Sequence, residues 1–106
     1  MKLTANQIRY LLTVKRLDET KHVIKSVDIA NELNISRASV HKMLKLLKKL
    51  NYIKQEHYGT LDITPSGSRV ANEYLDKYNQ VKKAVDPIVK IEEDYDLGIC
   101  TLIEMA

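Results

Sequence analysis

Residues 26–51, SVDIANELNISRASVHKMLKLLKKLN, read as two helices joined by a tight turn. Ser26 is a candidate N-cap of the first helix. The apolar face of that helix is formed by Ile29, Ala30 and Leu33. Asn34 follows, a residue type that tolerates the left-handed backbone conformation found just after helix ends. Ser36 can cap the second helix, because its hydroxyl accepts a hydrogen bond from free N–H groups of the first turn. This arrangement is typical of a helix-turn-helix.

The second helix has two chemically different faces. The apolar stripe, at helical spacing, is formed by Val40, Met43, Leu44, Leu47 and Leu50. The opposite face carries Ala38, Lys42, Lys45 and Lys49, flanked by Arg37 and His41. Residues 36–54 contain six basic side chains and no acid, whereas a solvated helix face usually mixes both signs. A cationic face beside a small, polar first turn favours a DNA-recognition helix. The plainer interpretation is a solubilising lysine face on a core helix.

The flanking segments predict a wing and further helices. We expect, in chain order, a helix over residues 5–19, a short strand at 23–24, a hairpin over 52–63, a helix over 65–85 and a final helix over about 92–105. Thr4 with Gln7 forms a capping-box pattern for the first helix. Thr64 followed by Pro65 marks the start of the long helix.

The predicted fold is therefore mainly α, of the α+β class. It is a winged helix-turn-helix with a long C-terminal dimerisation helix and a short final helix. We expect one compact unit, in which residues 1–64 form the DNA-binding part and residues 65–106 a helical dimerisation segment. The apolar stripe of the long helix outruns the winged core and needs a further surface to bury against.

Composition narrows the class of protein. No apolar run approaches the ~20 residues of a membrane span, and the single cysteine, Cys100, fits a reducing compartment. We therefore expect a cytoplasmic protein with no membrane partner. The charge is uneven, because residues 85–106 carry −5 and the rest of the chain +8. A basic half favours a polyanionic partner, namely double-stranded DNA. Motifs for nucleophilic, phosphate-loop or paired-carboxylate chemistry are missing from the sequence, so we expect no enzymatic activity.

Several short stretches together are similar to one known family. They are Tyr10-Leu11 with Val14 and Leu17, the run SVDIANEL at 26–33, Ser36 with Ser39-Val40, Leu47, Tyr52-Ile53, and LDITPSG at 61–67. With them the chain resembles the metal-dependent repressors of the diphtheria toxin repressor and manganese transport regulator type. The resemblance covers nearly all of the chain up to residue 85 and is looser beyond it.

The resemblance implies which residues contact DNA. Base-reading positions of the family fall on Ser36, Ala38 and Lys42, and backbone contacts fall on Arg37, Ser39 and His41. The wing would place Lys54, His57 and Tyr58 along the flanking backbone or minor groove. With the lysines of the basic face, the predicted DNA-binding set is Ser36, Arg37, Ala38, Ser39, His41, Lys42, Lys45, Lys49, Lys54, His57 and Tyr58.

The family's metal ligands are not reproduced in this chain. The resemblance places its ligand positions on Arg9 and Leu12, on Tyr78, and in the last helix on Cys100, Ile103 and Glu104 or on Thr101, Glu104 and Met105. Since a metal site needs three or four converging donors, we expect no metal and no cofactor, with Cys100 and Glu104 as weak candidate ligands. Either regulation is lost, or Arg9 replaces the metal by pairing with Glu104.

We therefore expect a sequence-specific transcriptional regulator, a repressor acting as a homodimer through residues 65–106. One alternative is a small-molecule-responsive regulator of the multiple-antibiotic-resistance type, with Tyr74 and Tyr78 lining a pocket. Another is a winged helix used as a protein–protein interaction module. Salt dependence separates DNA binding from the protein-interaction alternative, because phosphate contacts weaken steeply with salt.

Overall fold

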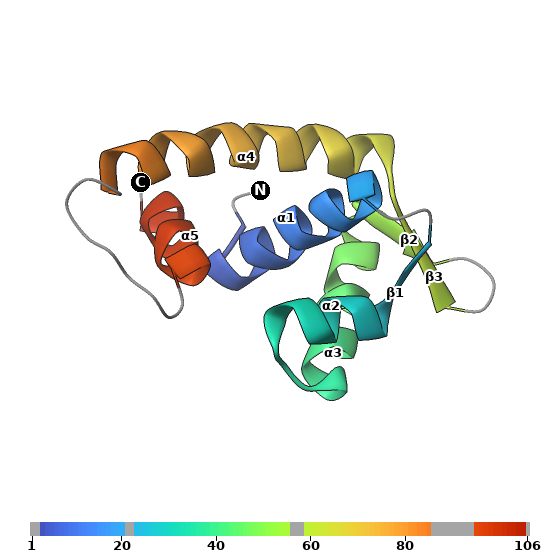
Figure 1. Ribbon diagram of the computed structural model, residues 1–106. Helices are drawn as coiled ribbons and strands as arrows, with labels where there is room; N and C mark the ends of the chain where they lie inside the picture. The colour runs from blue at the N-terminus through green and yellow to red at the C-terminus, as the bar shows by residue number, and fades with distance from the viewer. Residues whose placement is uncertain (1–2, 21–22, 56–58, 86–94, 106) are drawn as a thin grey trace.

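The structure, a computed structural model, describes residues 3–20, 23–55, 59–85 and 95–105. Its helices are α1 (Ala5–Thr20), α2 (Ser26–Leu33), α3 (Arg37–Lys49), α4 (Pro65–Val85) and α5 (Tyr95–Met105) (Figure 1). Its strands are β1 (Ile24–Lys25), β2 (Ile53–Gln55) and β3 (Thr60–Ile63). The mainly helical winged helix-turn-helix expected from the sequence is confirmed.

The small sheet is antiparallel, in the order β1-β3-β2. Ile24 pairs with Leu61 across β1 and β3, and Ile53 pairs with Ile63 across β2 and β3. The side chains of Ile24, Ile53 and Leu61 are buried, so one face of the sheet covers the core. The predicted hairpin is thus confirmed. The first strand lies one residue later than predicted, and Val23 is exposed rather than paired.

Local caps explain where the helices begin. The backbone N–H of Thr4 donates to Gln7 Oε1 and that of Gln7 donates to Thr4 Oγ1, which is the predicted capping box. Asn34 has φ 54°, the expected left-handed conformation after α2. The prediction for Ser26 is wrong, because β1 leads directly into α2 and places Lys25 at the N-cap. The backbone N–H of Lys25 donates to the Asp28 carboxylate at 2.8 Å.

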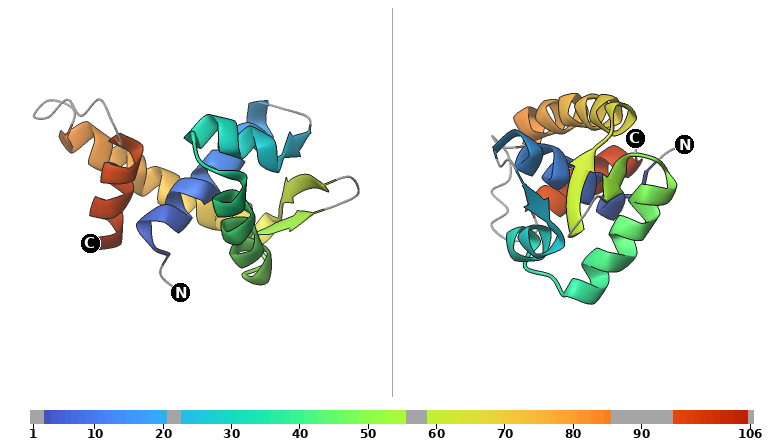
Figure 2. Two further views of the ribbon diagram at one scale, coloured as in Figure 1. Left: turned by 90° about the horizontal axis from the view of Figure 1, so that it is seen from below. Right: turned by 90° about the vertical axis from the view of Figure 1, so that its right-hand side faces the viewer.

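Two buried clusters share helix α1, which lies between α4 and α5 on one side and α2 and α3 on the other (Figures 1 and 2). The cluster of the winged part is built from Tyr10, Val14, Leu17, Ile24, Ile29, Ala30, Leu33, Val40, Leu44, Leu47, Ile53 and Leu61. The second cluster is built from Leu3, Ile8, Leu11, Ala71, Ile99, Cys100 and Ile103. None of the helices in the described part combines the length and apolarity needed to cross a membrane.

The long helix α4 has the predicted bounds, and its apolar stripe packs against other helices of the same chain. Val70, Tyr74, Tyr78 and Val81 pack against the second cluster. The backbone N–H of Leu3 also donates to the Tyr74 hydroxyl at 3.2 Å. The surface that the stripe was expected to need is therefore supplied in part by α1 and α5. In the final helix Ile99, Cys100 and Ile103 are buried, whereas Leu102 is 46% exposed.

The junction between the wing and α4 is closed by Thr64. Its hydroxyl donates to the carbonyl of Asn51 at 2.7 Å and accepts from the Gly67 N–H at 2.9 Å. Its own N–H donates to the carbonyl of Tyr52 at 3.0 Å. A Cβ on Gly67 would lie 2.0 Å from the Tyr52 carbonyl oxygen. The first turn of α4 therefore sits directly on the backbone after α3, and only glycine allows this approach.

We predict that Gly67→Ala lowers the free energy of unfolding by roughly 3 kcal/mol, because the added methyl group must displace backbone atoms. Gly98→Ala is the matched control, since a Cβ there meets nothing within 4 Å. That variant should be neutral, or more stable by up to about 1 kcal/mol, as expected for glycine in a helix. Urea unfolding followed by circular dichroism measures both. Equal stabilities would contradict the close packing at Gly67.

Candidate nucleic-acid interface

Helix α3 is anchored by its apolar face. Val40, Leu44 and Leu47 are buried in the winged core. The helix begins after Ser36, whose hydroxyl accepts from the N–H of Ser39 at 3.2 Å and donates to the Ser39 hydroxyl at 3.0 Å. It is followed by Asn51 in the left-handed conformation, with φ 63°. Both ends and one face are thus fixed, which determines where the opposite face points.

The opposite face of α3 is exposed and basic. The predicted contacts on it are all exposed, namely Ser36, Arg37, Ala38, Ser39, His41, Lys42, Lys45 and Lys49. The ion pairs found among the described residues join Lys15 to Glu19 and Arg16 to Glu32, and neither includes a residue of α3. The cations of this face therefore remain available for an anionic partner.

The wing lies beside the C-terminal end of α3. Lys48 Nζ donates a hydrogen bond to Gln55 Oε1 of β2 at 2.8 Å. This lysine therefore links α3 to the wing. Lys54, the predicted wing contact, is exposed on β2. The other two predicted wing contacts, His57 and Tyr58, lie outside the described residues.

A groove of about 720 Å³ runs between α1 and α3. Lys42, Lys45 and Lys49 line it from α3, and Asn6 and Arg9 line it from α1. The sequence did not single out Asn6, because an exposed asparagine on a helix has no distinguishing pattern. The groove shows that the N-terminal half of α1 borders the same surface as the basic face.

Tyr10 also borders this groove, although it belongs to the buried core. Burial raises the pKa of its hydroxyl above the ordinary value, and the nearby Arg9 cation partly opposes the rise. The phenol therefore stays neutral at physiological pH and contributes no charge to the surface. The basic character of the groove comes from its lysines and from Arg9.

Four of the positions that the resemblance assigned to a metal lie together, whereas Ile103 and Glu104 line a different hollow. Arg9, Leu12, Tyr78 and Cys100 line one hollow between α1, α4 and α5. Their chemistry does not fit a divalent metal, because a guanidinium and a leucine side chain supply no ligand atom. Among the described residues, no group of three or more histidine, cysteine, aspartate or glutamate side chains could hold a metal ion.

Glu104, one of the weak candidate ligands, has a structural role instead. Its Oε1 accepts a hydrogen bond from the backbone N–H of Ala5 at 2.6 Å, which ties α5 to the first turn of α1. A carboxylate at the N-terminus of a helix is also favoured by the helix dipole. The predicted pairing of Arg9 with Glu104 is wrong, because the described residues contain no ion pair between them.

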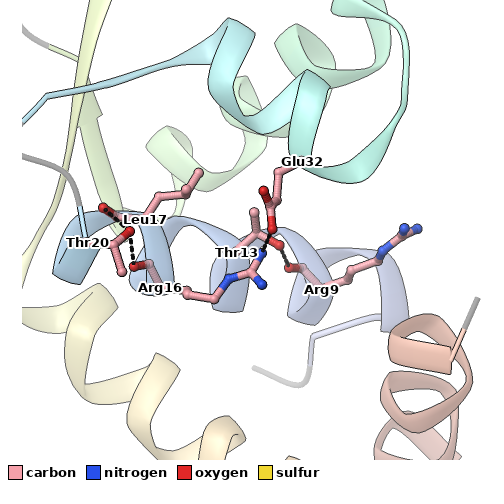
Figure 3. Close-up of polar contacts among 6 residues, drawn as sticks. All are labelled: Arg9, Thr13, Arg16, Leu17, Thr20 and Glu32. Atoms are coloured by element: carbon pink, nitrogen blue, oxygen red, sulfur yellow. Dashed lines mark hydrogen bonds and ion pairs between the residues drawn. The ribbon is translucent and has the colours of Figure 1, made fainter.

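Arg9 instead extends away from the Arg16–Glu32 ion pair in Figure 3, and the ion pairs of the described residues do not include it. Its backbone carbonyl accepts from the Thr13 hydroxyl at 2.8 Å. Its Nε is a buried donor without a hydrogen-bond partner within the part of the chain that the structure describes. A permanently charged side chain is therefore held half-buried with an unmet hydrogen bond.

The element order is that of a winged-helix protein, and the exposed basic face of α3 is typical of a recognition helix. Residues 2–61 match the family model described as iron dependent repressor, N-terminal DNA binding domain. The chain belongs to this family.

Comparisons with individual proteins support the same family. The chain is 35% identical over 69 residues to the HTH-type transcriptional regulator MntR of Listeria welshimeri, covering 65% of this chain and 49% of that protein. The crystal structure of T. acidophilum IdeR is similar with a TM-score of 0.73 and 26% identity, over 92% of this chain and 46% of that one. Lactococcus lactis ZitR shares the fold, with a TM-score of 0.68 and 23% identity over 99% of this chain and 72% of that one. The chain spans about half the length of the curated relatives it matches.

We predict that Glu104→Ala lowers the free energy of unfolding by about 1–2 kcal/mol, because the Ala5 N–H loses its charged acceptor. Glu104→Gln keeps an acceptor oxygen and should lose less. The exposed Glu73 supplies the control Glu73→Ala, expected to be near neutral. Urea unfolding with and without a metal chelator measures all three. A loss that appears only without chelator would instead assign Glu104 to a metal.

Proposed function

We propose that this chain is a sequence-specific, DNA-binding transcriptional regulator that acts as a homodimer in the cytoplasm and represses transcription. The observation that carries the proposal is the face of α3, which is exposed along its length, basic, and free of acids. Membership of the iron dependent repressor family supports it. The matched Listeria relative is named as a transcriptional regulator, which supports a binding function rather than a catalytic one.

We assign two roles to the residues of the α3 face. Ser36, Ala38 and Lys42 lie at the N-terminal half of the helix, where small side chains let the backbone approach base edges in the major groove. The proposed phosphate contacts are Arg37, Ser39, His41, Lys45 and Lys49. Phosphate contacts would fix the register of the helix on DNA, whereas the few base contacts would select the sequence.

The wing completes the proposed contact surface. Lys54 is exposed on β2, and together with His57 and Tyr58 it would follow the flanking DNA backbone. Lys48 is left out of the proposed contacts because its Nζ already donates to Gln55. This hydrogen bond would hold the wing at a fixed position relative to the recognition helix.

We propose residues 65–106 as the dimerisation segment, with residues 1–64 as the DNA-binding part. The supporting observation is that three large apolar side chains of α4 and α5 stay exposed, namely Leu75, Leu102 and Met105. Met105 is 77% exposed, and a second copy of the chain would cover such side chains. Two copies related by a two-fold axis would present their α3 helices to successive major grooves.

The proposal includes no resident metal. Its support is the chemistry of the hollow described above, where Arg9 and Leu12 stand at positions that the resemblance gives to ligands. A regulator of this kind would bind its operator without a metal, or respond to another kind of signal.

We predict that Lys45→Ala with Lys49→Ala lowers the magnitude of the slope of log affinity against log salt by roughly 2 per bound protomer, because each lost phosphate contact removes about 0.9. Affinity for a random duplex should fall accordingly at low salt. The measurement is fluorescence anisotropy at several salt concentrations.

The matched control is Lys77→Ala with Lys83→Ala, which removes the same charge from exposed positions on α4. It should leave the slope nearly unchanged. If DNA binding by the parent chain were absent or insensitive to salt, the proposal would be contradicted and the protein-interaction module favoured.

We predict that Leu102→Glu with Met105→Glu converts the dimer into a monomer, because two carboxylates would be buried in the interface. Val23→Glu is the control, since Val23 is 53% exposed but lies next to β1, away from α4 and α5. Sedimentation equilibrium measures the mass, which should halve in the first variant alone. An unchanged mass would exclude this face from the interface.

A further inference from the structure

The hollow between α1, α4 and α5 is basic. It has a volume of about 330 Å³, and its lining includes four cations and one carboxylate. The cations are Arg9, Lys15 and Arg16 of α1 and Lys82 of α4. It lies outside the proposed DNA contacts, because no residue of α3 lines it.

Two of the four cations are already neutralised within the chain. Lys15 lies 3.4 Å from the Glu19 carboxylate, and its Nζ also donates to the Ser68 hydroxyl at 2.9 Å. Arg16 forms an ion pair with Glu32 of α2. In the ranges that the structure describes, Arg9 and Lys82 have neither a hydrogen-bond acceptor for the side chain nor an ion pair. The hollow therefore carries an excess of positive charge.

Arg9 is the deeper of these two cations. Its Nε is buried and lacks an acceptor, while Lys82 is exposed at the rim. A guanidinium stays protonated at any physiological pH and presents its donors as a planar fork that matches a carboxylate. A carboxylate in the hollow would pair with the Arg9 guanidinium as a whole, and Lys82 at the rim would attract it.

Part of the lining is apolar. Leu12 of α1 and Leu75 of α4 contribute aliphatic surface, and Tyr78 contributes an aromatic ring. A fully hydrated inorganic anion gains nothing from such walls, whereas an organic anion can bury its hydrocarbon part there. The volume lies near the lower end of the range for small-molecule sites.

We propose that this hollow is a binding site for a small organic anion, a carboxylate carried on a compact aromatic or apolar body, with Arg9 as the carboxylate-binding residue. Arg9 lines both this hollow and the groove beside α3, whereas the rest of the hollow's lining lies outside the groove. The test of the hollow needs no DNA.

Calorimetric titration of the full chain tests the site, with benzoate as the probe and benzamide as its uncharged counterpart of the same shape. Benzoate should bind at least tenfold more tightly than benzamide, and more tightly than inorganic phosphate. Arg9→Met should weaken benzoate at least tenfold. Equal binding of benzoate and benzamide, or no binding of benzoate, would overturn the proposal.

A second pair of variants keeps the test decisive if Arg9→Met does not fold. Lys82→Glu reverses a charge at the rim of the hollow, and Lys83→Glu makes the same change at an exposed neighbour outside it. The first should weaken benzoate several-fold more than the second. Equal effects of the two substitutions would overturn the proposal, as would phosphate binding as tightly as benzoate.

Discussion

The whole structure depends on α1 being buried on two faces. Tyr10, Val14 and Leu17 pack into the winged core, while Ile8 and Leu11 pack against α4 and α5. A helix of a small protein usually buries one stripe and exposes the rest. Because α1 buries two, the winged part and the C-terminal helices cannot separate without exposing apolar surface on one side of it. The hydrogen bond from Ala5 to Glu104 reinforces the same connection at its first turn.

Because α1 is buried on two faces, only narrow strips between those faces can carry its polar residues. Arg9 lies on one of these strips. It lines the groove beside Lys42 and Lys45, and it also lines the hollow toward Tyr78 and Cys100. Thr13, one turn later, is buried and satisfies its hydroxyl on the Arg9 carbonyl. Arg9 cannot be satisfied in this way, because its side chain has donors only. Among the described residues, the unsatisfied Nε donor thus belongs to the residue that borders both the groove and the hollow.

Local sequence signals predicted most of the fold, while contacts between distant segments were not predictable. Helical periodicity and the caps at Ser36 and Thr64 depend on neighbours a few residues away, and both caps were confirmed. The partner of Glu104 is 99 positions away, so the sequence alone could not show it. The exposure of Leu102 likewise depends on how α5 turns against α1 and α4. For the candidate site, periodicity placed the basic face of α3 correctly but could not show the groove beside it.

The lysines of α3 are hard to explain by folding alone. Lys42, Lys45 and Lys49 are spaced three and four residues apart, and like charges at such spacing destabilise a helix by about 0.2–0.5 kcal/mol per pair. Lys49 recovers part of this cost from the helix dipole, because it lies in the last turn. Lys42 and Lys45 do not, and no acid of α3 offsets them. A polyanion placed along this face would turn the repulsion into attraction. Local rules of helix stability are therefore broken where a binding function would require it.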